Sequence, residues 1–132
     1  MKRFGLSAND RIKSRKEFEE IFSNGQTIFS SDRKIKVTYL IAKKIDKTGT
    51  VFSVAVFKKA GNAVWRNRIK RLLREAYRLN KNIIKETAVD KGLLLMLVFS
   101  PSTMNEKKNK KLYLADVMPG VKEILLKLKD KL

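Results

Sequence analysis

The chain has 132 residues, of which 31 are Lys or Arg and 13 are Asp or Glu, so its formal net charge is +18. A small chain with this much positive charge needs an anionic partner. Its composition is 43% hydrophobic, which distinguishes it from a disordered polybasic tail. The length suits one domain with a buried core, so we expect a single domain over residues 1–132.

The chain contains no Cys and no His. This composition excludes disulfide frameworks, thiol nucleophiles, zinc sites of the usual ligand set and imidazole acid–base catalysis. The longest apolar run, residues 93–99, is much shorter than the ~20 residues of a membrane-spanning helix. The basic N-terminus is not followed by an apolar stretch. We therefore expect no secretory signal, no membrane partner and a cytoplasmic location.

A first helix is predicted over residues 15–23. Residues 14–17 fit a capping box, the apolar residues that follow recur at helical spacing, and Asn24-Gly25 provides a C-terminal stop.

Two strands follow this helix. Residues 34–41 alternate between Ile35, Val37, Tyr39 and Ile41 on one face and Lys34, Lys36, Thr38 and Leu40 on the other. A turn at 46–49 leads to residues 50–57, which are β-branched and aromatic. We expect the two strands to pair directly as an antiparallel hairpin.

The second half of the chain predicts a helix, a strand and a helix. Gly61-Asn62 precedes a helical pattern from about Val64 to Asn82, and a buried strand over 93–99 ends at Ser100-Pro101. Pro119 suits the first turn of a last amphipathic helix. A lysine-rich segment near 103–118 should be exposed. The order helix, strands, helix, strand, helix indicates an α+β fold with a long basic helix packed on a small sheet.

The long helix carries a cationic side. At about 100° per residue its apolar side, measured from Trp65, includes Ile69, Leu72, Leu73, Ala76 and Leu79. The opposite half holds Arg66, Asn67, Lys70, Arg71, Arg74 and Arg78, and Arg68 lies on the flank. We expect the apolar side to cover the sheet.

A row of charges on an amphipathic helix is often only its solvated face. Here Glu75 is the only acid between Lys58 and Arg78, so like charges repel one another with almost no local compensation. An external polyanion would offset this repulsion, and the planar Arg fork suits phosphate contacts. The pattern therefore indicates nucleic-acid binding.

The segment from Phe57 to Arg78 resembles the signature of the bacterial ribonuclease P protein subunit. It matches without gaps through Lys-Lys, Gly-Asn-Ala-Val, Arg-Asn-Arg-Ile-Lys-Arg and Arg-Glu-Ala. The resemblance implies an α/β sandwich of the ribosomal protein S5 domain 2-like type, with a left-handed crossover at the long helix. It also implies that the RNA subunit hydrolyses precursor tRNA with bound Mg²⁺, while the protein supplies no catalytic residue and no metal site.

The resemblance also implies which residues bind RNA. Those facing the catalytic RNA, ribonuclease P RNA, would be Lys58, Lys59, Asn62, Arg66, Asn67, Arg68, Lys70, Arg71 and Arg74. Phe18 and Phe22 would line a cleft for the single-stranded 5′ leader of precursor tRNA, where bases stack on aromatic rings. Core packing is the alternative for both rings.

The chain departs from the family pattern at several leader positions. Lys36 and Thr38 stand where a cleft-facing aromatic is common, so either the strand register shifts or Lys36 contacts phosphate. Ser53, Ala55 and Phe57 replace an alternation of small and hydroxyl residues, and Ser100 stands where relatives often carry Arg. We expect altered leader contacts at these positions.

Other functions remain open at this stage. A non-enzymatic ribosomal or ribosome-assembly protein could use the same charge and fold. A DNA-binding protein would need a partner helix at helix-turn-helix spacing, which the pattern does not predict. Membrane-surface binding would need the apolar face of the long helix to be free for lipid.

Overall fold

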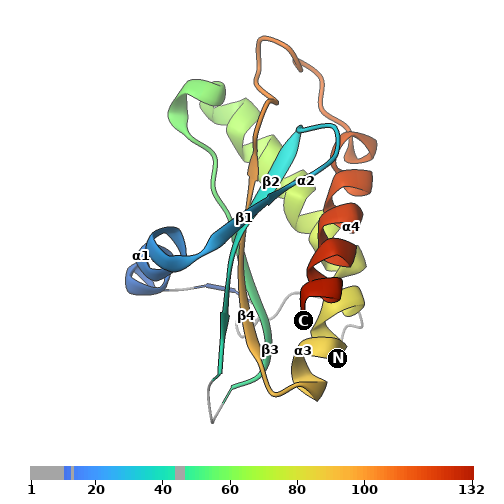
Figure 1. Cartoon of the computed structure of the whole chain (residues 1–132). Coiled ribbons are helices and arrows are strands. Elements are labelled where there is room, and N and C mark those ends of the chain that lie inside the picture. Colours follow the sequence, from blue (N-terminus) through green and yellow to red (C-terminus); the bar gives the residue numbers. More distant parts are fainter. Residues whose placement is uncertain (1–10, 13, 44–46) are drawn as a thin grey trace, which may run out of the picture.

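A four-stranded sheet with helices on both faces forms the centre of the computed structural model, which describes residues 11–12, 14–43 and 47–132 (Figure 1). The secretory signal considered at the N-terminus and part of the turn expected at 46–49 lie outside these residues. In chain order the elements are α1 (Arg15–Asn24), β1 (Gln26–Phe29), β2 (Ile35–Ala42), β3 (Gly49–Val54), the short helix η2 (Lys58–Ala60), α2 (Ala63–Asn80), α3 (Asn82–Asp90), β4 (Leu94–Pro101) and α4 (Leu114–Lys131). The predicted α+β class is confirmed.

The strand order is β1-β2-β4-β3, so the predicted direct pairing of residues 34–41 with residues 50–57 is wrong. β4 lies between them, antiparallel to β2 and parallel to β3. Every residue of β4 is buried, and a strand that is apolar on both faces is most stable in the centre of a sheet. The connection from β3 to β4 is formed by α2 and α3, as a parallel pair requires.

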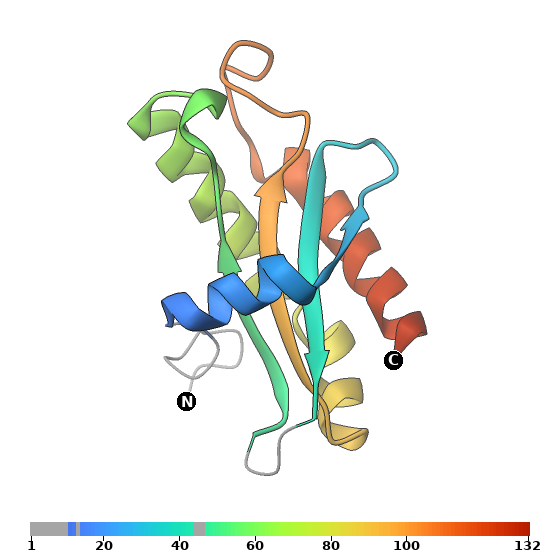
Figure 2. The same cartoon turned by 60° about the vertical axis from the view of Figure 1, so that its left-hand side comes forward.

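Each face of the sheet has its own apolar core. On one face, Val37, Phe52 and Leu97 belong to the larger core, which α2, α3 and α4 cover. On the other face, Val51, Met96 and Ile21 of α1 form a smaller core. Figure 2 shows that α1, a single short helix, crosses only part of its face of the sheet.

The helix predicted at residues 15–23 is confirmed, with one more residue at its end. The Oγ atom of Ser14 accepts hydrogen bonds from the backbone N–H groups of Lys16 and Glu17, at 3.1 and 3.4 Å. The helix ends at Gly25, its C-cap. Only glycine fits at this position, because a Cβ atom would lie 2.3 Å from the carbonyl oxygen of Ile21. The backbone therefore turns tightly from α1 into β1.

Three further elements differ from the sequence prediction. The short strand β1 was not predicted, and the predicted helix up to residue 82 ends at Asn80, where α3 follows after Lys81. The last helix begins at Leu114, so Pro119 lies inside it. The segment 103–118 is consequently part loop and part helix.

Candidate nucleic-acid interface

The residues of α2 that the resemblance assigns to RNA binding separate into two groups by exposure. Asn67, Arg68, Arg71 and Arg74 are exposed, whereas Arg66 and Lys70 are half-buried. The sequence interpretation placed Arg68 on the flank and Arg66 in the outward half, and the structure reverses these two positions. The outward face of α2 is therefore centred on Arg68, Arg71 and Arg74.

The reason for this rotation is Tyr77, which the sequence analysis did not assign to the core. Its ring is fully buried against Phe52 and Phe99, at centroid distances of 4.2 and 6.0 Å. The buried arc of the helix therefore centres near Ile69 and extends towards Tyr77. This arc brings Arg66 and Lys70 close to the sheet.

Arg66 has a polar atom that the fold leaves without a protein partner. Its Nε atom is buried and makes no hydrogen bond to any residue that the structure describes, although Arg66 as a whole is half-buried. A buried donor without a partner is costly, and a phosphate or base at the surface would not reach Nε without moving the side chain. Arg66 therefore has a packing role, and the phosphate contact that the resemblance implies for it stays a prediction.

Glu75 does not neutralise the outward face. Its carboxylate accepts a 3.0 Å hydrogen bond from Nε of Arg78, one turn further along α2. This hydrogen bond holds the pKa of Glu75 below its usual value. Glu75 is the one acid of α2, and its carboxylate is engaged by Arg78. The face that carries Arg68, Arg71 and Arg74 therefore keeps a net positive charge.

The start of α2 is joined to a distant loop through Asn62. The Asn62 side chain caps the helix by accepting a 2.8 Å hydrogen bond from the backbone N–H of Trp65. Its amide Nδ2 donates to Glu106, at 2.9 Å, and its backbone N–H donates to the same carboxylate at 2.8 Å. Asn62 thus has a structural role at this end of the interface, beside the exposed Lys58 and Lys59 of η2.

The other predicted residues lie on the face of the sheet that α1 crosses. Phe18 packs against the smaller core, and Phe22 is 53% exposed. Their rings are nearly parallel, with centroids 6.5 Å apart. The structure therefore favours core packing for much of Phe18 but leaves the ring of Phe22 accessible.

The register of β2 answers the question raised at Lys36. Val37 and Tyr39 belong to the larger core, so Lys36 and Thr38 point to the α1 side without any shift. Lys36 pairs with Ser100 of β4 on one side and with Phe29 of β1 on the other. The structure thus brings Lys36 to the same side of the sheet as Phe18 and Phe22.

Sequence reasoning missed two residues beside Lys36. Phe29 supplies an aromatic ring on the α1 side, and the guanidinium of Arg33 lies 4.6 Å from its centroid. Phe29 was missed because β1 was not predicted. A strand of four residues is too short for its alternation of polar and apolar residues to be recognised in the sequence. An aromatic residue therefore stands next to Lys36 although β2 carries none on that side.

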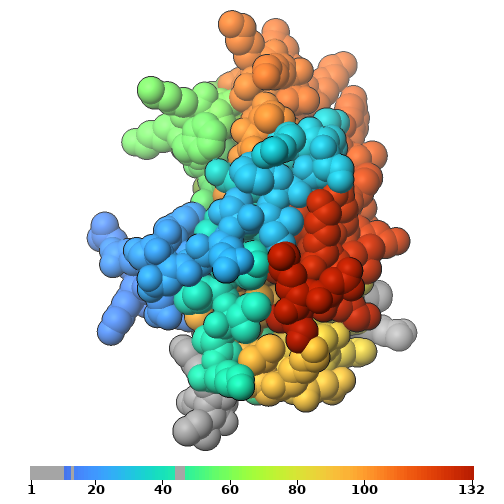
Figure 3. Space-filling view, in the orientation of Figure 1, coloured from blue at the N-terminus to red at the C-terminus, as the bar shows by residue number. Residues whose placement is uncertain are grey.

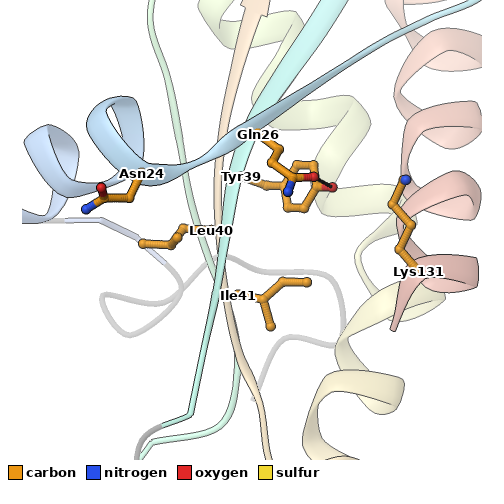
Figure 4. A pocket seen from close by; sticks show the side chains of 6 residues that line it. All are labelled: Asn24, Gln26, Tyr39, Leu40, Ile41 and Lys131. Atoms are coloured by element: carbon orange, nitrogen blue, oxygen red, sulfur yellow. Dashed lines mark hydrogen bonds between the residues drawn. The ribbon is translucent and has the colours of Figure 1, made fainter.

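A separate pocket of about 340 Å³ lies at the outer edge of β2 (Figure 4). Its lining is formed by Asn24, Gln26, Tyr39, Leu40, Ile41 and Lys131. The Tyr39 hydroxyl donates a 3.0 Å hydrogen bond to Oε1 of Gln26, and burial raises the pKa of Tyr39. None of these side chains carries a carboxylate, and none of them was predicted as a site residue.

Within the described ranges, no group of three or more Asp or Glu residues is arranged to hold a metal ion. Among the same residues, no helix is both long enough and apolar enough to cross a membrane. The surface described above presents exposed cations on α2 and η2 and an accessible aromatic ring at Phe22. Cations of this kind suit phosphate groups, and exposed aromatic rings suit unpaired bases.

Known proteins similar to this chain share both its sequence pattern and its fold. A family model described as Ribonuclease P matches residues 6–118. The ribonuclease P protein component of Syntrophus aciditrophicus is 38% identical over 85 residues, which cover 64% of this chain and 67% of that protein. The one from Clostridium kluyveri is 36% identical over 88 residues, covering 67% and 71%.

Solved structures agree with the sequence comparison. An RNase P protein from Staphylococcus aureus has a TM-score of 0.65 and 27% identity, with 94% of this chain and 92% of that chain covered. The RNase P protein from Thermotoga maritima has a TM-score of 0.65 at 23% identity, with 89% and 96% covered, and supports the fold alone.

Proposed function

Because this chain belongs to the Ribonuclease P family, we propose that it is the protein subunit of a ribonuclease P ribonucleoprotein that removes the 5′ leader of precursor tRNA. Its partners in this role are the catalytic RNA and precursor tRNA. The observation that carries the proposal is the outward face of α2, where Arg68, Arg71 and Arg74 are exposed and the one acid of the helix, Glu75, is engaged by Arg78. The proposal also places the protein in the cytoplasm, where both RNAs are made.

In this proposal the RNA performs the hydrolysis with Mg²⁺ ions that it binds itself. The protein contributes cations that bind phosphates and release counterions, which lowers the repulsion between the catalytic RNA and its substrate. Fewer free Mg²⁺ ions are then needed for the same compact complex. Lys58, Lys59, Arg66 and Lys70 extend the contact beyond the three exposed arginines.

The leader would bind on the α1 side of the sheet. Phe22 offers an accessible ring for an unpaired base, and base–aromatic stacking is worth ~1–3 kcal/mol without reading the sequence. Lys36 supplies a cation for the leader backbone, and Phe29 lies beside it. Ser53 and Ala55 are half-buried near the end of β3, and Ala55 packs against the smaller core on this side.

The decisive experiment combines the protein with ribonuclease P RNA and precursor tRNA and measures 5′ cleavage as the Mg²⁺ concentration is lowered. We expect the protein to extend cleavage to Mg²⁺ concentrations at which the RNA alone is inactive, and to cleave nothing by itself. A variant with Arg68, Arg71 and Arg74 all changed to Gln should lose this effect while keeping its melting temperature. If the wild-type protein gives no gain at any Mg²⁺ concentration, the non-enzymatic RNA-binding alternative replaces the proposal.

A further inference from the structure

The loop between β4 and α4 is held in place at both ends by apolar side chains. Met104 and Leu112 are almost fully buried and belong to the larger core. Between them, residues 105–111 form a compact turn, which we call the lysine loop. It contains four exposed lysines, namely Lys107, Lys108, Lys110 and Lys111.

The lysine loop is fastened to the start of α2 by four hydrogen bonds. The backbone N–H of Glu106 donates to the carbonyl of Ala60 at 2.7 Å, and the indole N–H of Trp65 donates to the carbonyl of Asn109 at 2.8 Å. The Glu106 carboxylate accepts the two hydrogen bonds from Asn62 described above. Figure 3 shows the loop, in orange, against the green surface where α2 begins.

The loop is also ordered internally. Asn105 accepts hydrogen bonds from the backbone N–H groups of Lys108, at 2.9 Å through Oδ1, and of Asn109, at 2.8 Å through its carbonyl. Gly61 permits the close approach to α2, because a Cβ atom there would lie 2.9 Å from Cβ of Glu106 and from the Trp65 ring. A loop that served only to connect two elements would not need this many fixed contacts.

The result is a second group of cations next to those of η2. A hollow of about 480 Å³ lies between the two segments, and Lys59, Lys107 and Lys110 contribute to its lining. Glu106 is the one acid in this lining, and its carboxylate is already engaged by Asn62. The lysine side chains therefore repel one another here unless an anion binds.

We propose that the lysine loop is a second RNA-binding surface, which extends the interface of α2 and η2 around the end of the sheet and contacts phosphodiester groups. The occupant follows from continuity and chemistry. The loop adjoins the proposed RNA interface, and its exposed side chains are flexible point charges that suit phosphates rather than bases or apolar partners. This inference rests on the proposed function, and it adds four residues to which no role has been given.

The loop lies at fixed geometry before RNA arrives, so less conformational entropy is lost on binding than with a free lysine-rich tail. The two sources of such phosphates are the catalytic RNA and precursor tRNA. Both present the same chemistry, and the measurement below distinguishes them.

The test is the salt dependence of RNA binding by a variant in which Lys107, Lys108, Lys110 and Lys111 are all Gln. In the matched control, Lys43, Lys47, Lys122 and Lys129 are all changed to Gln. These four lysines are also exposed but lie away from η2. Both variants therefore lose the same charge. Affinity for ribonuclease P RNA, and separately for precursor tRNA, is measured over a range of salt concentrations. The lysine-to-arginine version of the loop serves as the rescue variant.

We expect the loop variant to bind at least one of the two RNAs about tenfold or more weakly, with a slope of log K against log salt that is less steep by about 1.4–1.8, equivalent to two lost phosphate contacts. The control should change the slope by less than the ~0.7–0.9 that corresponds to one phosphate contact. The arginine version of the loop should restore the wild-type slope. Equal changes in the loop variant and the control would overturn the inference while leaving the proposed function intact. Failure of the wild-type protein to bind either RNA would instead contradict the proposed function itself.

Discussion

The ring of Tyr77 stacks on the ring of Phe52, with 4.2 Å between their centroids and 22° between their planes. The Tyr77 hydroxyl also shares a 2.8 Å hydrogen bond with the hydroxyl of Thr50, and all three residues are buried. Phe52 and Thr50 belong to β3, so this contact sets the rotation of α2 on the sheet. The same rotation turns Arg68 and Arg71 outward.

Tyr77→Phe should lower the free energy of unfolding by about 1–3 kcal/mol, because it leaves the buried Thr50 hydroxyl without this partner while keeping the ring contact. Urea denaturation measures the loss. Thr50→Val is the matched control, and the double variant should lose clearly less than the sum of the two single losses. Additive losses would mean that the two hydroxyls do not depend on each other.

Single substitutions on α2 should separate binding from packing. Arg68→Ala and Arg71→Ala are expected to leave the melting temperature unchanged and to make the salt dependence of RNA binding less steep by about 0.7–0.9 each, since each removes one phosphate contact. Arg66→Ala and Lys70→Ala should reduce the slope in the same way, and Arg66→Ala should also change stability because that side chain is half-buried. An unchanged slope for Arg68→Ala would assign that side chain to solvent alone.

The elements with strong local signals were predictable from the sequence. The cap at Ser14 and the stop at Gly25 bound α1 as expected, and the alternation in β2 placed Val37 in the core and Lys36 on the opposite side. The apolar stripe of α2 likewise predicted that this helix covers the sheet. In each case the pattern that determines the element lies within the element itself.

The features that the sequence did not predict depend on contacts between distant segments. Pairing of β4 with both β2 and β3 is a competition among strands, and local alternation cannot decide it. The burial of Tyr77, at the edge of the helical stripe, depends on Phe52 and Phe99 in two other elements. The attachment of Glu106 to Asn62 joins residues that no periodicity relates.

Phe22→Ala tests the proposed leader contact with little effect on the fold, because the ring is 53% exposed. We expect a loss of ~1–3 kcal/mol in the affinity for precursor tRNA and none for mature tRNA, as stacking on an unpaired leader base predicts. Leu126→Ala on α4, on the opposite side of the sheet, is the control for loss of an exposed apolar side chain and should change neither affinity. Equal losses for both tRNAs would contradict stacking by Phe22.

Phe18→Ala should behave differently from Phe22→Ala. Because Phe18 packs against the smaller core, we expect a lower free energy of unfolding, by less than the ~3–5 kcal/mol of a fully buried ring. A loss of precursor tRNA affinity that persists well below the melting temperature would show that Phe18 also contacts the leader. Comparing denaturant stability and both tRNA affinities on the same protein distinguishes the two roles.

The stability of the turn between β1 and β2 should depend on pH through Glu123. This carboxylate of α4 accepts a 2.8 Å hydrogen bond from Lys127 and further hydrogen bonds from the Ser31 backbone at 3.0 and 3.1 Å, which lower its pKa from 4.5 to about 2. A carboxyl whose pKa is lower in the folded state stabilises the fold above its unfolded pKa and loses that contribution as the pH falls through the folded value.

Glu123→Gln should therefore lower the free energy of unfolding by about 1 kcal/mol near neutral pH, a size typical of hydrogen-bonded groups at the surface. The difference from wild type should stay constant down to the unfolded pKa of 4.5 and then shrink towards the folded value of about 2. Urea titrations across this range measure it, with Glu86→Gln, on an exposed position of α3, as the control that should show no such trend. If the difference between Glu123→Gln and wild type were the same at every pH, the ionised carboxylate would not be what holds the turn of Ser31 against α4.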